Sequence, residues 1–145
     1  IAYTGGGART SATGLLADVA LVVDVTHATD YPGLEKRKHG DYRLGGGAVF
    51  TRGASVNPVL LELLITEAEA EGIPYTLEAA PRETRTDADS IFTAHRGVAT
   101  ALVSVPLRYM HSPNEMVSLE DLERAARVLA GVARRIGPST DLIPR

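Results

Sequence analysis

Two short apolar runs constrain the fold of this chain more than any other feature. The first is DVALVVDV at residues 18–25 and the second is VATALVSVP at residues 98–106, and both are rich in β-branched residues. Neither run alternates with polar residues, which is typical of strands that are buried on both faces of a sheet. We therefore expect both runs to be interior strands of a sheet that helices cover.

Two amphipathic helices are predicted to provide that cover. Asn57, which is followed by a proline, can cap a helix over residues 57–71 that a glycine ends. Ser118 can cap a second helix over residues 118–136, whose leucines and valines fall on one side. Strands that alternate with helices of this length predict an α/β fold, a three-layer mixed sheet with flanking helices.

The remaining segments carry weaker signals. Glycine-rich residues predict a loop with at most one helical turn, mixed charge with Pro and Gly predicts an exposed connection, and shorter periodic runs predict small elements. In chain order these are the loop 1–14, the connection 26–40, the strands 48–51 and 75–79, and a helix over 87–95.

The composition excludes several classes of function. A chain of 145 residues with a net charge of −3 and no block of Lys or Arg fits one domain, and offers no electrostatic footprint for nucleic acid or an anionic membrane. No apolar run approaches the roughly 18 residues that would cross a bilayer. The chain has no cysteine, so a metal site would use His and carboxylates.

The first residues are informative for what they lack. The opening IAYTGGGART starts without methionine, which leads us to expect a fragment or a processed product. It also lacks the basic start and apolar core of a secretory signal, so we expect a cytoplasmic location.

Three residues near the ends of the apolar strands could carry chemistry. Asp24 is flanked by valines, where a partly desolvated carboxylate either caps the next turn, pairs with an arginine, or serves a metal or catalytic site. His111 follows the second strand on a loop, as a ligand or as a solvated surface residue. His27 lies just past Asp24, where a shared site is an open alternative.

Asp87 and Asp89 form a close acidic pair in TRTDADS. Paired carboxylates could suggest hydrolysis, but residues two apart on a helix point away from each other. The alternative for Asp87 is a helix cap.

Several strings resemble one enzyme family in the same order. They are GARTSA at 7–12, VVDVTHATDYPG at 22–33, LGGGAVFTRGASVNP at 44–58, TDA at 86–88 and VPLRYMHSPNE at 105–115. Together they resemble the C-terminal part of the tetrahedral, deblocking or glutamyl aminopeptidases, metallopeptidase family forty-two, some of whose members carry endoglucanase labels. The resemblance implies that residues 1–145 are the C-terminal half of a zinc-peptidase-like catalytic domain.

The resemblance also implies a site for two divalent metal ions, zinc or cobalt, and a peptide substrate. Asp24 corresponds to a ligand of one metal and His111 to a ligand of the other. We further predict Arg108, His27 and Asp87 as substrate-binding residues, with Arg108 anchoring a substrate carboxylate or an acidic neighbour.

The family's other ligands and its catalytic glutamates precede the GARTSA string, and its inserted assembly domain also lies upstream. A gapless alignment places Ile1 and Ala2 where the paired glutamates fall. We therefore predict no catalytic residue in this chain, weak or no metal binding by it alone, and association as a homo-oligomer or with a partner chain. The alternative is a noncatalytic relic or binding module that retains the peptidase fold.

Overall fold

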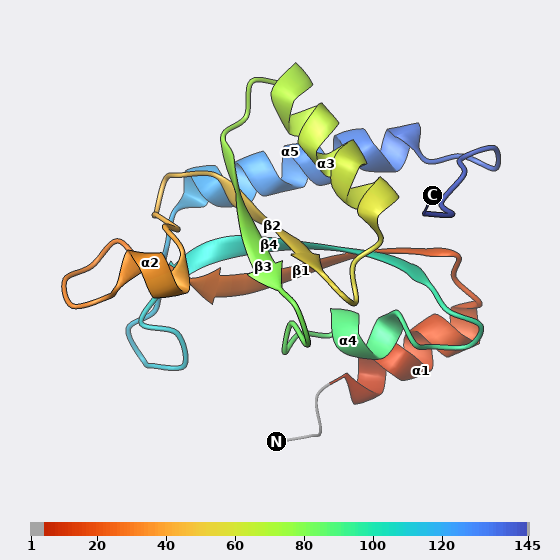
Figure 1. Ribbon diagram of the computed structural model, residues 1–145, viewed down its shortest axis with the longest axis horizontal. Coiled ribbons are helices and arrows are strands. Elements are labelled where there is room, and N and C mark those ends of the chain that lie inside the picture. Colours follow the sequence, from red (N-terminus) through yellow and green to blue (C-terminus); the bar gives the residue numbers. More distant parts are fainter. Residues whose placement is uncertain (1–4, 145) are drawn as a thin grey trace.

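The computed structural model describes residues 5–144, which form a mixed sheet with helices on both sides (Figure 1). The strands pair in the order β1-β4-β2-β3, and the short β5 pairs with β4. The strands are β1 (Val19–His27), β2 (Ala48–Gly53), β3 (Tyr75–Ala80), β4 (Ala99–Arg108) and β5 (Met116–Val117). The helices are α1 (Gly6–Leu15), α2 (Lys36–His39), α3 (Pro58–Ala70), α4 (Ala88–Ile91) and α5 (Leu119–Arg135).

Strand β4 is the centre of the sheet. It runs parallel to β1 on one side and antiparallel to β2 on the other. Every residue of β4 between Thr100 and Leu107 is buried. The prediction of an interior strand over residues 98–106 is therefore confirmed.

The same prediction for residues 18–25 is wrong. Within residues 5–144, β1 has β4 as its one neighbouring strand, and the side chain of Val23 is 54% exposed. An apolar sequence does not show whether a strand pairs on one side or on both, because it indicates which side chains favour burial and not which strands lie beside them.

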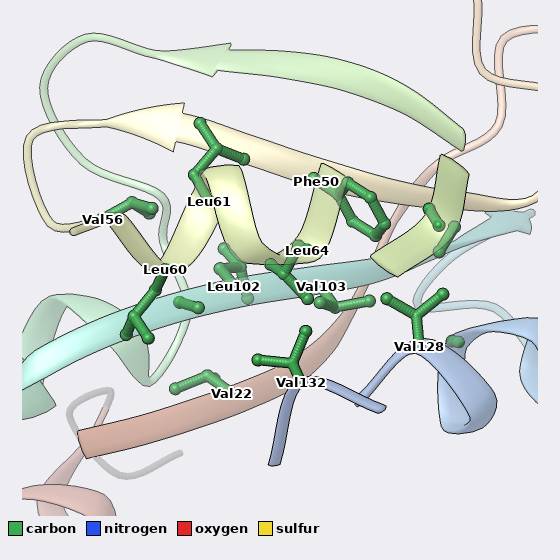
Figure 2. Close-up of a cluster of buried hydrophobic side chains, with 14 of the residues drawn as sticks. Val22, Phe50, Val56, Leu60, Leu61, Leu64, Leu102, Val103, Val128 and Val132 are labelled. Carbon is green, nitrogen blue, oxygen red and sulfur yellow. The ribbon is translucent and has the colours of Figure 1, made fainter. Parts of the chain in front are cut away.

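Helices α3 and α5 cover one face of the sheet and confirm the predicted helices to within one residue at each end. Asn57 caps α3 by accepting hydrogen bonds from two backbone N–H groups, and Ser118 caps α5 by accepting one from the N–H of Asp121. Figure 2 shows how their apolar side chains meet those of the sheet in one core. Its fully buried members include Phe50, Leu60, Leu64, Val103, Val128 and Val132.

Helices α1 and α4 lie on the other side of the sheet, below it in Figure 1. The prediction of a loop over residues 1–14 is wrong for its described part, because α1 is ten residues long. Its Ala12 packs with Ala94 and Val98 in a small apolar cluster, and this tertiary contact outweighs the low helix propensity of the glycines. Residues 1–4 lie outside the described part of the chain.

The shorter elements follow the sequence less closely. The predicted strands 48–51 and 75–79 are confirmed as β2 and β3. The predicted helix 87–95 shrinks to the single turn of α4. The connection 26–40 begins later than predicted, because β1 continues to His27, and it contains α2.

Two helical glycines give a matched test of the packing. A Cβ on Gly131 of α5 would lie 1.9 Å from Oε1 of Glu67, a buried residue of α3 that is ion-paired with Arg135. A Cβ on Gly14 of α1 meets no atom within 4 Å. We expect Gly131→Ala to lower the free energy of unfolding by about 1–3 kcal/mol through overpacking. We expect Gly14→Ala to raise it by up to about 1 kcal/mol.

Urea unfolding followed by circular dichroism measures both changes. Equal effects of the two substitutions would contradict the close approach of α3 to α5.

Candidate active site

A cleft of about 630 Å³ opens where β1 ends. Its lining comes from β2 and β4, from the end of β1, from the end of β3 with the loop that follows, and from the loop after β4. The lining residues that matter below are Asp24, Thr26, His27, Glu78, Ser104 and His111.

Asp24 and His111 line this same cleft, as predicted for two residues at one end of the sheet. They come together because β1 and β4 are parallel, so that the two strands end at the same edge (Figure 1). Asp24 is half-buried, and its Oδ1 accepts a hydrogen bond of 2.7 Å from the backbone N–H of Val25. This bond orients the carboxylate three residues before the end of β1.

His111 lies on an exposed loop with an unusual backbone. Its φ is 65° and that of Tyr109 is 59°, in the left-handed region that few non-glycine residues adopt. The N–H of His111 donates to Oε1 of Glu115 at 2.6 Å. Backbone strain of this kind persists where surrounding contacts impose it, and it clusters at functional sites.

Arg108 is held by an acidic neighbour. Its Nε donates to Oδ1 of Asp30 at 2.8 Å, and its Nη2 lies 2.8 Å from Oδ2. Oδ2 also accepts from the N–H of Leu44. Hydrogen bonding by Arg108 holds the pKa of Asp30 below its ordinary value, although burial opposes this effect. The pair connects the end of β4 to the segment that follows β1. The sequence left two partners open for Arg108, a substrate carboxylate or an acidic neighbour, and the structure shows the acidic neighbour.

The other two predicted substrate residues lie in different places. His27 is exposed and lines the cleft. Asp87 is exposed at the start of α4, outside the cleft lining, and its side chain makes no capping hydrogen bond.

The partner of Asp87 in the acidic pair has a structural role. Asp89 accepts hydrogen bonds from both the N–H and the hydroxyl of Thr84 and from the N–H of Arg85. Burial would raise the pKa of Asp89, but these bonds outweigh it and lower the pKa. Asp89 therefore shapes the loop that forms one wall of the cleft.

Sequence reasoning missed Glu78. This residue of β3 is half-buried in the cleft, and its Oε1 accepts a hydrogen bond of 3.0 Å from the hydroxyl of Thr26 on β1. Because β1 and β3 are at opposite ends of the strand order, this contact requires a strongly curled sheet. Burial raises the pKa of Glu78. The available signal was a lone carboxylate inside the strand YTLEAA.

The donor chemistry of Asp24 and His111 suits zinc or cobalt, since both metals accept imidazole and carboxylate ligands. Among residues 5–144, however, no group of three or more His, Asp or Glu side chains could hold a metal ion. A zinc site normally has three or four protein ligands. The two residues therefore fit as part of a metal centre that the described chain does not complete.

Comparison with known proteins identifies the family. The family model described as M42 glutamyl aminopeptidase matches residues 4–128. The chain belongs to this family. A lysyl aminopeptidase of Pyrococcus furiosus is 33% identical over 134 residues, which is 91% of this chain and 37% of that protein.

Solved structures of aminopeptidases agree with this assignment. An aminopeptidase from the archaeon Desulfurococcus kamchatkensis is 40% identical with a TM-score of 0.76, over 88% of this chain and 37% of the other. A TET aminopeptidase from a thaumarchaeote of marine sediment is 31% identical with a TM-score of 0.83, over 92% and 37%. The chain thus spans little more than a third of the length of its family relatives. None of the helices described in residues 5–144 could span a membrane.

The Arg108 pair gives a pH-dependent prediction for stability. Asp30→Asn should lower the free energy of unfolding at pH 7 by about 1–3 kcal/mol, because it weakens a largely buried charge-assisted bond. The folded pKa of Asp30 is depressed, so the carboxylate stabilises the fold above its ordinary pKa and stops doing so as the pH falls through the folded value. The difference from wild type should therefore shrink below about pH 4.

Chemical unfolding at pH 7 and pH 3 measures this difference. Asp41→Asn is the control, because Asp41 pairs with Lys36 and Arg43 on the exposed surface, where a pair contributes less than about 1 kcal/mol. A deficit for Asp30→Asn that grows at low pH would contradict the role of the ion pair.

Proposed function

We propose that the intact protein is a dinuclear metal-dependent aminopeptidase that hydrolyses N-terminal residues from peptides. In this proposal, Asp24 is a ligand of one metal ion and His111 is a ligand of the other. The observation that carries the proposal is that both side chains line one cleft in a chain of the M42 family. The remaining ligands and the general base come from residues outside this chain.

When bound, zinc or cobalt would acidify a water molecule and polarise the scissile carbonyl. The chain's own residues would hold their positions for this reaction. The Val25 N–H orients the carboxylate of Asp24, and the constrained loop presents His111. His27 would contact the peptide at the wall of the cleft.

Arg108 and Asp87 have weaker support as substrate contacts. The guanidinium of Arg108 is occupied by Asp30, so in the proposed enzyme it would act by fixing the His111 loop. Asp87 does not line the cleft, but its neighbours Arg85 and Thr86 do, so it would contact only a peptide that extends beyond the cleft.

We also propose a homo-oligomeric assembly in the cytoplasm. A TET peptidase of Pyrococcus horikoshii, 27% identical with a TM-score of 0.63, can assemble into a tetrahedron or a large octahedral shell. The exposed edge of β1, with Val23 open to solvent, supports an association between this chain and further polypeptide.

The test compares the 145-residue chain with a form extended by the sequence encoded upstream of Ile1. We expect the short chain to bind zinc or cobalt weakly and to release no amino acid from peptides or p-nitroanilides, and the extended form to do both. In the extended form, Asp24→Ala and His111→Ala should each lower kcat/KM by more than about a hundredfold. Loss of a residue that only supports a metal ligand costs up to about a hundredfold, and loss of a direct ligand should cost more.

Asp18→Ala and His95→Ala are matched controls, because both residues are exposed and neither lines the cleft. Robust turnover by the short chain, or undiminished turnover in both ligand variants, would contradict the proposal. An extended form that binds metal but never turns over would favour the noncatalytic alternative.

A further inference from the structure

A second cavity, of about 340 Å³, lies beside the cleft. The two cavities share three residues of their lining, Thr26, His27 and Glu78. Beyond these, the second cavity is lined by Thr29, Tyr31, Leu34, His39 and Tyr42. It is therefore a side chamber of the cleft and not a separate site.

Glu78 is the one carboxylate in the described lining of this side chamber, and no lysine or arginine lines it. Within residues 5–144 Glu78 forms no ion pair with a lysine or arginine, and its Oε1 accepts a hydrogen bond from the neutral hydroxyl of Thr26. The other titratable groups of the chamber are the imidazoles of His27 and His39 and the phenols of Tyr31 and Tyr42, of which His27 and Tyr42 interact electrostatically with Glu78. Burial disfavours the charge of this half-buried carboxylate, and the Thr26 hydroxyl and the His27 imidazole offset that effect only in part, since the pKa of Glu78 stays raised.

The aromatic walls of the chamber contact neighbouring parts of the chain. Gly40 lies against the ring of Tyr42 so closely that an added Cβ would be 2.4 Å from Cζ. The ring of Tyr31 is 6.5 Å from that of Tyr109, centroid to centroid. Tyr109 precedes His111 by two residues, so the chamber adjoins the loop that carries this predicted ligand.

We propose that the side chamber binds the side chain of the peptide's N-terminal residue, and that Glu78 selects a cationic one, lysine or arginine. This inference rests on the proposed function, because the scissile bond must lie between Asp24 and His111 for the chamber to receive that side chain. The aliphatic stem would pack against Tyr31, Leu34 and Tyr42, and the charged head would reach the carboxylate. The tyrosine rings add an attractive surface for a cation.

The first test is a binding comparison that needs no turnover. L-lysinamide and L-norleucinamide share the same α-ammonium group and chain length, so they differ in the ε-ammonium group. Chemical-shift titrations of the 145-residue chain should give a dissociation constant about tenfold lower for L-lysinamide than for L-norleucinamide. In Glu78→Gln, which keeps an oxygen to accept from Thr26, the two amides should bind within about twofold of each other.

Glu123→Gln is the control for net charge, since Glu123 is exposed on α5 and lines neither cavity. Equal binding of the two amides to the wild-type chain would overturn the proposal. A preference for L-lysinamide that survives in Glu78→Gln would overturn the role of Glu78.

The second test uses hydrolysis by the form that carries the upstream sequence. The ratio of kcat/KM for lysine and leucine p-nitroanilides should fall about tenfold in Glu78→Gln, with the leucine substrate unchanged. If no nitroanilide is cleaved while the Glu78-dependent binding preference persists, the proposed function fails and the cation-binding chamber stands. If leucine is cleaved faster than lysine and Glu78→Gln leaves the ratio unchanged, the proposed function stands and the chamber's selectivity is wrong.

Discussion

The parallel pairing of β1 with β4 runs from Val19 opposite Ala99 to His27 opposite Leu107. Both strands therefore leave the sheet at the same edge, and the polar residues that follow them are neighbours. Asp24 lies near the end of one strand and His111 just beyond the end of the other. Helices α3 and α5 pack on one face of the sheet against the buried side chains of β4, and this packing holds β4 in place.

The segments beyond that edge are joined by contacts of a different kind. The Arg108–Asp30 ion pair connects the end of β4 to the segment after β1, and the Tyr31–Tyr109 ring contact connects the loop after β4 to the same segment. The curl of the sheet adds a third connection, from Thr26 to Glu78. These contacts allow short loops with strained residues to keep a defined shape at the cleft.

Local signals were enough to predict the central strand β4 and the helices α3 and α5, because capping residues and helical periodicity act within a few residues. Helix α1 was missed because its glycines lower the helix propensity of the segment. The helix is stabilised by a contact of Ala12 with Ala94, which is distant in the sequence. The exposed edge of β1 was missed because an apolar run does not reveal which neighbours a strand has.

The lining of the cleft was predictable only in part. That Asp24 and His111 lie in one cleft follows from the rule that ligands gather where strands end, joined with the family resemblance. Glu78 does not follow from it, because its place in the cleft depends on the curl that brings β3 to β1. An acidic neighbour of Arg108 was one of the predicted alternatives, but its identity as Asp30 was not predicted, since the two residues are 78 positions apart in the sequence.

The central claim is that Asp24 and His111 serve two metal ions in one cleft. Anomalous diffraction at the zinc or cobalt edge, from crystals of the form that carries the upstream sequence, measures this most directly. The account predicts two ions about 3.5–4 Å apart, one within about 2.0–2.2 Å of an Asp24 oxygen and the other at a similar distance from a His111 nitrogen. Two well-occupied ions that neither residue contacts would contradict it.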